Sequence, residues 1–339
     1  MEKSPKVSVI IPIYKVESYI ERCACSLFEQ TLDDIEYIFV NDCTPDSSMT
    51  ILFDVIEQYP RRKPQIQIIH HDVNKGLPTA RNSGLKIAVG EYIIHCDSDD
   101  WVEKDMYESL YNKAVEEDAD IVGCDYFYEY INKSVYTKLL FGQNENKCFQ
   151  KMLSINGIYG NTWNRLVKKN IYTDNNIRFP EEISMCEDIV ATLQLHYFAK
   201  KISYIPKAFY HYTQYHMNSI TKCVNQQQLE DMLQSCQIIE SFLHQHHIYE
   251  QYYKLFMERV FKYKQNMILI KSLRDFEHWH TIWPESNQLQ LIWHYTIPLK
   301  MKIIFSLVKY KLYSIVIYLL EMKLRMNYSA ACSEVSNKN

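Results

Sequence analysis

Three carboxylates stand close together at Asp97, Asp99 and Asp100, directly after the apolar run of residues 91–96. Such a run is typical of a buried strand, so the tetrad Asp97-Ser98-Asp99-Asp100 is expected where a strand ends. Like charges this close repel, and burying them costs free energy unless a cation or strong hydrogen-bond donors hold them. Mg²⁺ and Mn²⁺ prefer oxygen ligands, and Mg²⁺ is usually held by one or two carboxylates plus substrate phosphates. The tetrad therefore predicts a divalent cation with a bound diphosphate, the alternative being a solvated acidic turn.

The segments before the tetrad alternate between apolar strands and amphipathic helices. We expect buried strands at residues 7–13, 35–40, 65–69 and 91–96, and helices at residues 16–29, 47–59 and 77–89. This alternation predicts an α/β fold with a mainly parallel central sheet flanked by helices. Ligands of such sheets bind beyond the carboxyl ends of the strands, where this chain places its polar motifs.

Four blocks occur in a fixed order in these polar motifs: the opening strand with Pro12 and Tyr14, the loop Asn41-Asp42-Cys-Thr-Pro-Asp-Ser-Ser48, the stretch Asn74-Lys-Gly76-Leu-Pro-Thr-Ala-Arg81-Asn-Ser-Gly84, and Asp97-Ser-Asp99. Together these blocks resemble the inverting family 2 glycosyltransferases. The resemblance covers residues 5 to 220. It implies the GT-A fold, which binds nucleotide-diphospho-sugars, and a DXD motif for the metal.

The chain departs from the family pattern at two places. Cys43-Thr44 replaces Gly-Ser, which removes the conformational freedom of glycine from that loop. Thr213 stands where arginine is common, so a cationic contact to the diphosphate is expected from His211, His216 or Lys222, or is absent.

The donor site follows from side-chain chemistry together with the resemblance. Asp42 can accept a hydrogen bond from an imide N–H such as N3 of uracil, which favours a UDP-sugar; alternatively it forms an Asx turn. Arg81 offers a planar cationic fork for phosphate or the face of a base; alternatively it forms a surface ion pair. The resemblance implies nucleotide-sugar binding by Pro12, Tyr14, Glu17, Asp42, Asn74, Gly76, Arg81, Asp97 and Ser98. It implies metal binding by Asp99 and Asp97, and His211 is a further candidate metal or phosphate ligand.

A single-displacement transfer also needs a carboxylate that takes the proton of the acceptor hydroxyl. Glu187-Asp188 resembles the Glu-Asp pair that begins a helix in this family, which makes Asp188 the expected base. The alternative is that both acids only complement the dipole of the helix. Trp163, Asp100 and Glu187 are the residues expected to contact the donor or acceptor sugar, although a tryptophan is more often part of the core.

Taken together, the motifs predict transfer of one hexosyl unit from a UDP-sugar to a saccharide or lipid-linked saccharide. The cofactor would be Mg²⁺ or Mn²⁺, and the configuration would be inverted. A Gln-x-x-Arg-Trp motif is absent, which argues against a processive synthase of surface polysaccharide. The alternatives are a catalytically silent binding protein of the same fold and, with less support, a sugar-nucleotide pyrophosphorylase.

Composition favours a cytoplasmic protein. The formal net charge of −4 gives no reason to expect nucleic acid as a partner. The ten cysteines form no C-x-x-C pair or disulfide framework, and no signal peptide precedes the first strand, so reduced thiols in the cytoplasm are expected.

The chain after residue 222 changes in character, and we expect a catalytic domain at residues 1–222 and a helical extension at residues 223–339. Between residues 298 and 326, six cations and one acid alternate with aliphatic side chains, and no 18-residue window is free of charge. This pattern predicts either a helix lying on an anionic membrane surface or an amphipathic helix packed on the catalytic domain.

Overall fold

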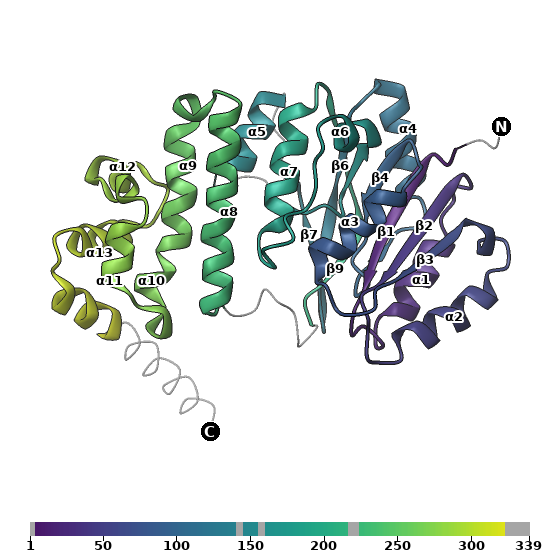
Figure 1. Ribbon diagram of the computed structural model, residues 1–339, viewed down its shortest axis with the longest axis horizontal. Coiled ribbons are helices and arrows are strands. Elements are labelled where there is room, and N and C mark those ends of the chain that lie inside the picture. The colour runs from purple at the N-terminus through teal and green to yellow at the C-terminus, as the bar shows by residue number, and fades with distance from the viewer. Residues whose placement is uncertain (1–3, 140–144, 155–159, 216–223, 323–339) are drawn as a thin grey trace. The chain divides into compact units, whose positions relative to one another are not determined.

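The computed structural model describes residues 4–139, 145–154, 160–215 and 224–322. The chain divides into two compact units, one of residues 1–153 and 157–222 and one of residues 154–156 and 223–339. Each unit is described by itself below (Figure 1).

The first unit is built on one sheet, in which the described residues contribute nine strands in the order β3-β2-β1-β4-β8-β6-β9-β5, with β7 paired to β6. The strands are β1 (Val7–Ile13), β2 (Ile35–Asn41), β3 (Ile66–His70), β4 (Tyr92–His95), β5 (Trp101–Val102), β6 (Ile121–Tyr130), β7 (Lys133–Thr137), β8 (Arg165–Lys168) and β9 (Ile202–Thr213). The first four strands of the chain are parallel to one another. Beyond β4 the sheet is mixed, because β8 lies antiparallel between β4 and β6. The predicted mainly parallel order is confirmed for the four predicted strands, and the strands beyond β4 make the whole sheet mixed.

Helices cover both faces of this sheet. They are α1 (Ile20–Phe28), α2 (Ser48–Gln58), α3 (Leu77–Ile87), α4 (Met106–Glu117), α5 (Glu145–Leu153), α6 (Lys169–Asp174) and α7 (Glu187–Phe198). One core layer joins Val7, Val9 and Ile11 of β1 to α1, α2 and α4, and a second joins Ile10 to α3, α6 and α7. Since both faces are buried, β1 needs an unbroken apolar run rather than an alternating one.

The helix α1 begins four residues later than expected, at Ile20. The backbone N–H groups of Val16 and Glu17 donate to Ser48 Oγ and Asp46 Oδ2 instead of entering a helix. The helix then buries Ile20, Cys23, Ala24, Leu27 and Phe28, which is the spacing of one helical face. Residues 14–18 are consequently a loop at the carboxyl edge of the sheet.

The second unit is helical in its described part. Its helices are α8 (Gln226–Gln245), α9 (Tyr249–Lys264), α10 (Asn266–Leu269), α11 (Phe276–Thr281), α12 (Leu289–His294) and α13 (Leu299–Lys309). Asn225 and Gln228 cap the start of α8 reciprocally. The ring of Phe261 packs against Tyr295 and Phe305, with ring centroids 4.8 Å apart in both pairs. This aromatic group ties α9 to the chain around α12 and α13.

Candidate active site

The acidic tetrad lies directly after β4, and its four residues have different tasks. Ser98 Oγ donates to the carbonyl of Pro12 at 2.6 Å. The buried Asp100 accepts from the backbone N–H of Thr213 at 2.7 Å and from the Tyr210 hydroxyl at 2.8 Å. Ser98 and Asp100 thus hold the turn against β1 and β9, and Asp97 and Asp99 are partly exposed.

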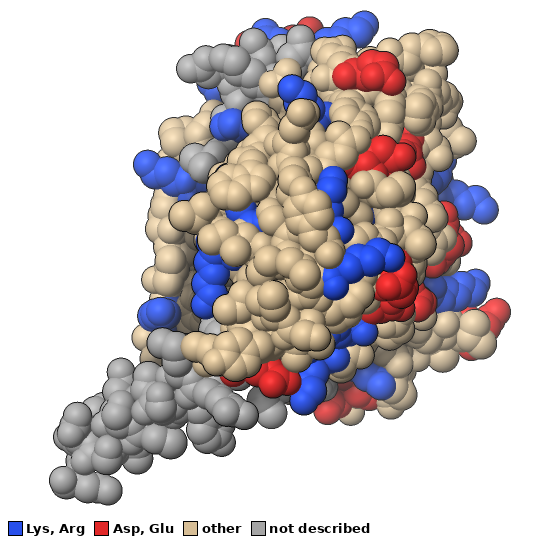
Figure 2. All heavy atoms as spheres, turned by 90° about the vertical axis from the view of Figure 1, so that its left-hand side faces the viewer, with Lys and Arg blue, Asp and Glu red and all other residues tan. Residues whose placement is uncertain are grey.

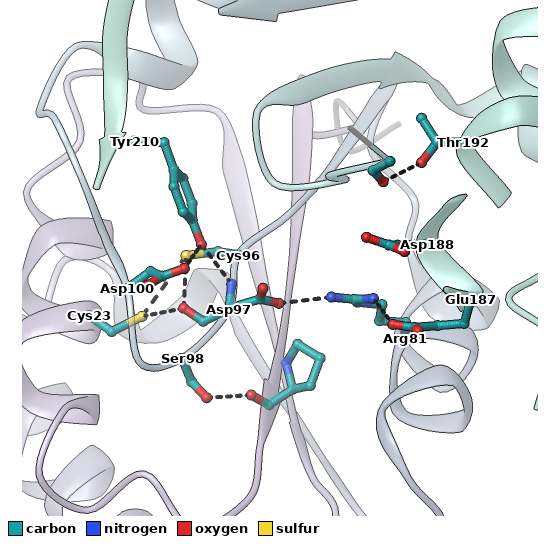
Figure 3. Close-up of polar contacts among 12 residues, drawn as sticks. Cys23, Arg81, Cys96, Asp97, Ser98, Asp100, Glu187, Asp188, Thr192 and Tyr210 are labelled. Carbon is teal, nitrogen blue, oxygen red and sulfur yellow. Dashed lines mark hydrogen bonds and ion pairs between the residues drawn. The ribbon is translucent and has the colours of Figure 1, made fainter. Parts of the chain in front are cut away.

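A single buried arginine joins the tetrad to the second acidic motif. Arg81 of α3 donates from Nη2 to Asp97 Oδ1 and from Nη1 to Glu187 Oε1, both at 2.9 Å. Figure 3 shows the guanidinium between these two carboxylates, with Asp188 beside it. Burial opposes the charge of Arg81, but Asp97, Glu187 and Asp188 outweigh burial and raise its pKa. Two motifs about ninety residues apart in sequence therefore meet in one charged cluster.

Asp188 lies in the first turn of α7, next to Glu187. One of its oxygens accepts from the backbone N–H of Ile189 at 2.7 Å. Burial raises the pKa of Asp188, while Arg81 opposes this shift. Burial also raises the pKa of Glu187, and the Asp188 charge adds to the effect. A carboxylate with a raised pKa is better suited to accept a proton near neutral pH.

The start of α7 is held in place by close backbone packing. A Cβ on Gly160 would lie 2.6 Å from Cα of Ile189, so only glycine fits there. Thr192 Oγ1 donates to the carbonyl of Gly160 at 2.8 Å. These contacts fix the turn that carries Glu187 and Asp188.

Asp42, at the end of β2, is the centre of a buried hydrogen-bond network. Its carboxylate accepts four hydrogen bonds, from His71 Nδ1 (2.7 Å), Asn74 Nδ2 (3.0 Å), and the backbone N–H groups of Lys75 and Gly76 (2.8 Å each). Gly76 adopts a φ of +87° at the start of α3, a conformation that glycine tolerates best. The structure thus brings Asp42, Asn74 and Gly76 together.

The loops after β1 and β2 are bonded to one another. The backbone N–H of Lys15 donates to Thr44 Oγ1 at 2.8 Å, and Glu17 Oε2 accepts from the backbone N–H of Ser47 at 3.0 Å. Cys43 has a φ of +55°, so it adopts the left-handed conformation for which glycine would be better suited. Tyr14 is exposed at the edge of this pair of loops.

Comparison with known proteins shows which family the chain is similar to. The sequence profile of the family described as "Glycosyl transferase family 2" matches residues 8–173. The chain is 31% identical over 258 residues to EpsH of Bacillus subtilis, which is named as a glycosyltransferase, and the match covers 74% of this chain and 73% of that relative. The chain belongs to glycosyltransferase family 2.

Other members of the family are similar as well. A poly(ribitol-phosphate) β-glucosyltransferase of Bacillus spizizenii is 33% identical, with 61% of this chain and 32% of the relative matched. Among solved structures, TarS of S. aureus in complex with UDP-GlcNAc superposes with a TM-score of 0.70 at 22% identity, covering 95% of this chain and 92% of that one. This structural likeness shows that the chain has the GT-A fold.

Two carboxylates of this glycosyltransferase fit the divalent cation that the family pattern implies. No group of three or more His, Cys, Asp or Glu side chains able to hold a metal occurs among the described residues. Asp97 and Asp99 nevertheless match the usual Mg²⁺ site of one or two carboxylates completed by substrate phosphates.

His211 does not fit the metal site predicted for it. Its Nδ1 bonds to Glu129 at 2.8 Å and its Nε2 to Glu103 at 3.0 Å, so both ring nitrogens are occupied by carboxylates. Its ring also stacks between Trp101 and Phe127. The structure therefore favours a structural role for His211, and we leave it out of the proposed metal site.

Two residues predicted to contact a sugar lie in the interior instead. Trp163 is buried, with its ring stacked on that of Tyr210 at 4.2 Å and 14°. Asp100 is fully buried and bonded to β9. Burial raises the pKa of Asp100, with Asp99 and Asp97 adding to the effect. Covered in this way, neither side chain offers a surface to a sugar, and both stabilise the turn that carries Asp97 and Asp99.

Sequence reasoning missed several residues that support the site. They are Arg22, His71, Gly160 and Tyr210. His71 directly follows β3, so its place at a strand end was a usable signal. The others depend on contacts with distant segments that no local spacing reveals. The segment 216–223, which includes the predicted residues His216 and Lys222, lies outside the described residues.

Proposed function

We propose that this glycosyltransferase moves one hexosyl unit from a UDP-sugar, with inversion, to a hydroxyl of a saccharide or lipid-linked saccharide. The observation that carries the proposal is the ion-pair bridge from Asp97 through Arg81 to Glu187. This bridge connects Asp97, on the proposed donor side, with Glu187 and its neighbour Asp188, on the proposed acceptor side. The UDP-GlcNAc complex of the structural neighbour TarS supports the choice of donor.

Each group has a defined task in this proposal. Asp188 accepts the proton of the acceptor hydroxyl while that oxygen attacks the anomeric carbon. Arg81 opposes the protonation of Asp97 and Glu187 and holds both carboxyl groups in place, and Asp42 with the loop of Asn74 and Gly76 forms the base pocket. Asp99 and Asp97 would hold Mg²⁺ or Mn²⁺, and the bound ion would supply positive charge to the leaving diphosphate.

The relatives support a polymeric, hydroxyl-rich acceptor. The Bacillus spizizenii relative is named for glucosyl transfer to poly(ribitol phosphate), and TarS for transfer of N-acetylglucosamine to the same polymer. An acceptor of this kind belongs to the biosynthesis of surface polysaccharide.

Removing the metal or its ligand should lower donor turnover selectively. With a panel of UDP-sugars and an extract-derived saccharide acceptor, we expect UDP release for one sugar. EDTA or Asp99→Asn should lower kcat/KM by roughly ten- to a hundredfold, since a charged ligand to the diphosphate is lost. Coupled detection of UDP measures the rate, and NMR of the product shows its anomeric configuration.

The control for this experiment is Asp174→Asn, because Asp174 is an exposed aspartate at the end of α6. Activity that persists in EDTA and in Asp99→Asn would reject the metal site. Retention of anomeric configuration would reject the proposed single displacement.

We also propose that residues 298–326 contact the anionic surface of the cytoplasmic membrane. In α13, Ile304, Phe305 and Val308 are buried within the helical unit, whereas Leu299 and Ile303 are 62% and 45% exposed. Further exposed apolar side chains in this part of the chain are Trp293, Tyr310, Leu312, Ile315 and Tyr318. Lysines 300, 302, 309 and 311 stand among them.

This composition fits a lipid headgroup region better than a neutral partner. Figure 2 shows the side of the helical unit that carries α12 and α13, where Lys and Arg side chains are scattered among uncharged side chains and Asp and Glu side chains are also present. Aliphatic burial and basic charge both favour an anionic bilayer surface. Among the described residues no helix is both long and apolar enough to cross a bilayer.

Sedimentation with vesicles tests this surface. We expect the full chain to sediment with vesicles containing phosphatidylglycerol, and less with neutral vesicles or at high salt. The double variant Leu299→Glu, Ile303→Glu should remain in the supernatant, whereas Val115→Glu, an exposed valine of α4, should behave as the parent. Sedimentation of the double variant at the parental level would overturn the proposal.

A further inference from the structure

Arg22, in the first turn of α1, is bonded to the backbone of the metal-site turn. Its Nη2 donates to the carbonyl of Asp99 at 3.1 Å and to Thr213 Oγ1 at 3.2 Å. Its Nη1 donates to the Tyr215 hydroxyl at 2.6 Å. One guanidinium thus joins α1, the acidic turn and the end of β9.

Aromatic rings hold this guanidinium in place. Its Cζ lies 3.6 Å from the centre of the Trp101 ring, which stacks in turn on His211 at 4.7 Å and 8°. His211 stacks on Phe127 at 5.0 Å and 18°. Since stacking leaves the edge of an arginine available for hydrogen bonds, its N–H groups stay directed in the plane of the fork.

The hydrogen bonds that Arg22 makes within the described part of the chain do not include a carboxylate acceptor. Its hydrogen bonds there go to neutral oxygens, namely a carbonyl and two hydroxyls. Its Nε–H is buried and has no hydrogen-bond acceptor among the described residues, and one Nη1 proton is also unused there. An arginine in this state offers both charge and N–H groups to an anion.

We propose that Arg22 binds the diphosphate of the donor and of the UDP product. The inference rests on the proposed UDP-sugar specificity and adds a residue to it. An anion held through a metal on Asp99 would bind close to this residue, whose backbone carbonyl Arg22 already contacts. Thr213, where the family pattern predicts a cation, accepts a hydrogen bond from Arg22, so a cation from α1 stands beside that position.

The proposal is tested by comparing UDP with uridine as ligands of the full chain. In Arg22→Gln, we expect the affinity for UDP to fall roughly ten- to a hundredfold, as for loss of a charge-assisted contact, and the affinity for uridine to change less than about twofold. Arg22→Lys should lie between, because it keeps the charge and loses the fork. Equilibrium titration of both ligands gives the ratio.

Arg62→Gln is the matched control. Arg62 is another partly buried arginine, and it donates to the carbonyls of Phe28, Gln30 and Leu32 at the other end of α1. It should lower stability without changing the UDP-to-uridine ratio. Equal losses for UDP and uridine in both Arg22 variants would show a purely structural role and overturn the inference, as would unchanged UDP binding. A parent chain that binds no UDP would instead reject the proposed donor itself.

Discussion

Asp188→Asn should reduce kcat by about 10³-fold, within the range of roughly 10²–10⁴ that general bases contribute, while UDP still binds. Asparagine keeps the shape of the side chain and can still accept from the Ile189 N–H, so α7 should remain intact. It cannot take a proton from the acceptor. Initial rates at saturating donor and acceptor, together with UDP titration, separate the loss of chemistry from a loss of binding.

The pH dependence of the parent gives an independent check. Burial raises the pKa of Asp188 above its usual 3.8, so the carboxylate becomes protonated at a higher pH than an exposed aspartate. The rate should therefore fall on acidification at a higher pH than it would with an exposed aspartate as the base, and the falling limb should disappear in Asp188→Asn. A variant that keeps its rate within about threefold of the parent would show that another group is the base. A parent that binds donor and acceptor without turnover would favour the silent binding protein.

Arg81→Gln should destabilise the catalytic unit by about 3–5 kcal/mol near pH 8, the usual cost of leaving a buried charge without its partner. Asp97 and Glu187 would lose their ion pairs, and Asp188 would lose a nearby positive charge. Urea unfolding of parent and variant measures the free energy of unfolding. Arg178→Gln is the control, because that guanidinium is bonded to the adjacent carbonyl of Ile177.

The loss in Arg81→Gln should shrink as the pH is lowered. The pKa values of Asp97, Glu187 and Asp188 are already raised by burial, and removal of the cation raises them further. The folded variant then binds more protons than the unfolded chain between the unfolded and folded pKa values. Its stability must therefore decrease as pH rises through that interval and recover on acidification. A destabilisation that is the same at pH 5.5 and pH 8 would argue against an electrostatic cause.

The first half of the fold is predictable because its strands are buried on both faces. The apolar run Val7–Ile13 predicts a strand with the bounds that the structure shows, and β2, β3 and β4 differ from expectation by one residue at one or both ends. In a chain of this composition, a short unbroken apolar run is typical of a strand that is buried on both faces. Two of the strands after the acidic turn have no comparable signal, since β5 and β8 are only two and four residues long. Such short strands are defined by their partners rather than by a pattern of their own.

The candidate site was likewise only partly predictable, because some of its residues are marked by the local sequence and others only by contacts between distant segments. Spacing and resemblance identify Asp97, Asp99 and the Glu187-Asp188 pair, and the structure joins the two motifs through Arg81. The prediction for Trp163 is wrong, because an exposed platform and a buried stack on Tyr210 have the same local sequence. Nothing in the local sequence marks Arg22 as a site residue. Its contacts form only where α1, Trp101 and the end of β9 meet in the fold.

The saturated carboxylate of Asp42 has a consequence for how a nucleobase is chosen. A carboxylate has about four acceptor positions, and His71, Asn74, Lys75 and Gly76 already occupy them. A base that donates an N–H to Asp42 must displace one of these donors, so the number of hydrogen bonds does not increase. The contact then adds little affinity, which must come from stacking and phosphate. The contact would select among bases, because a base without an N–H at that edge would displace a donor without forming a replacement hydrogen bond to Asp42.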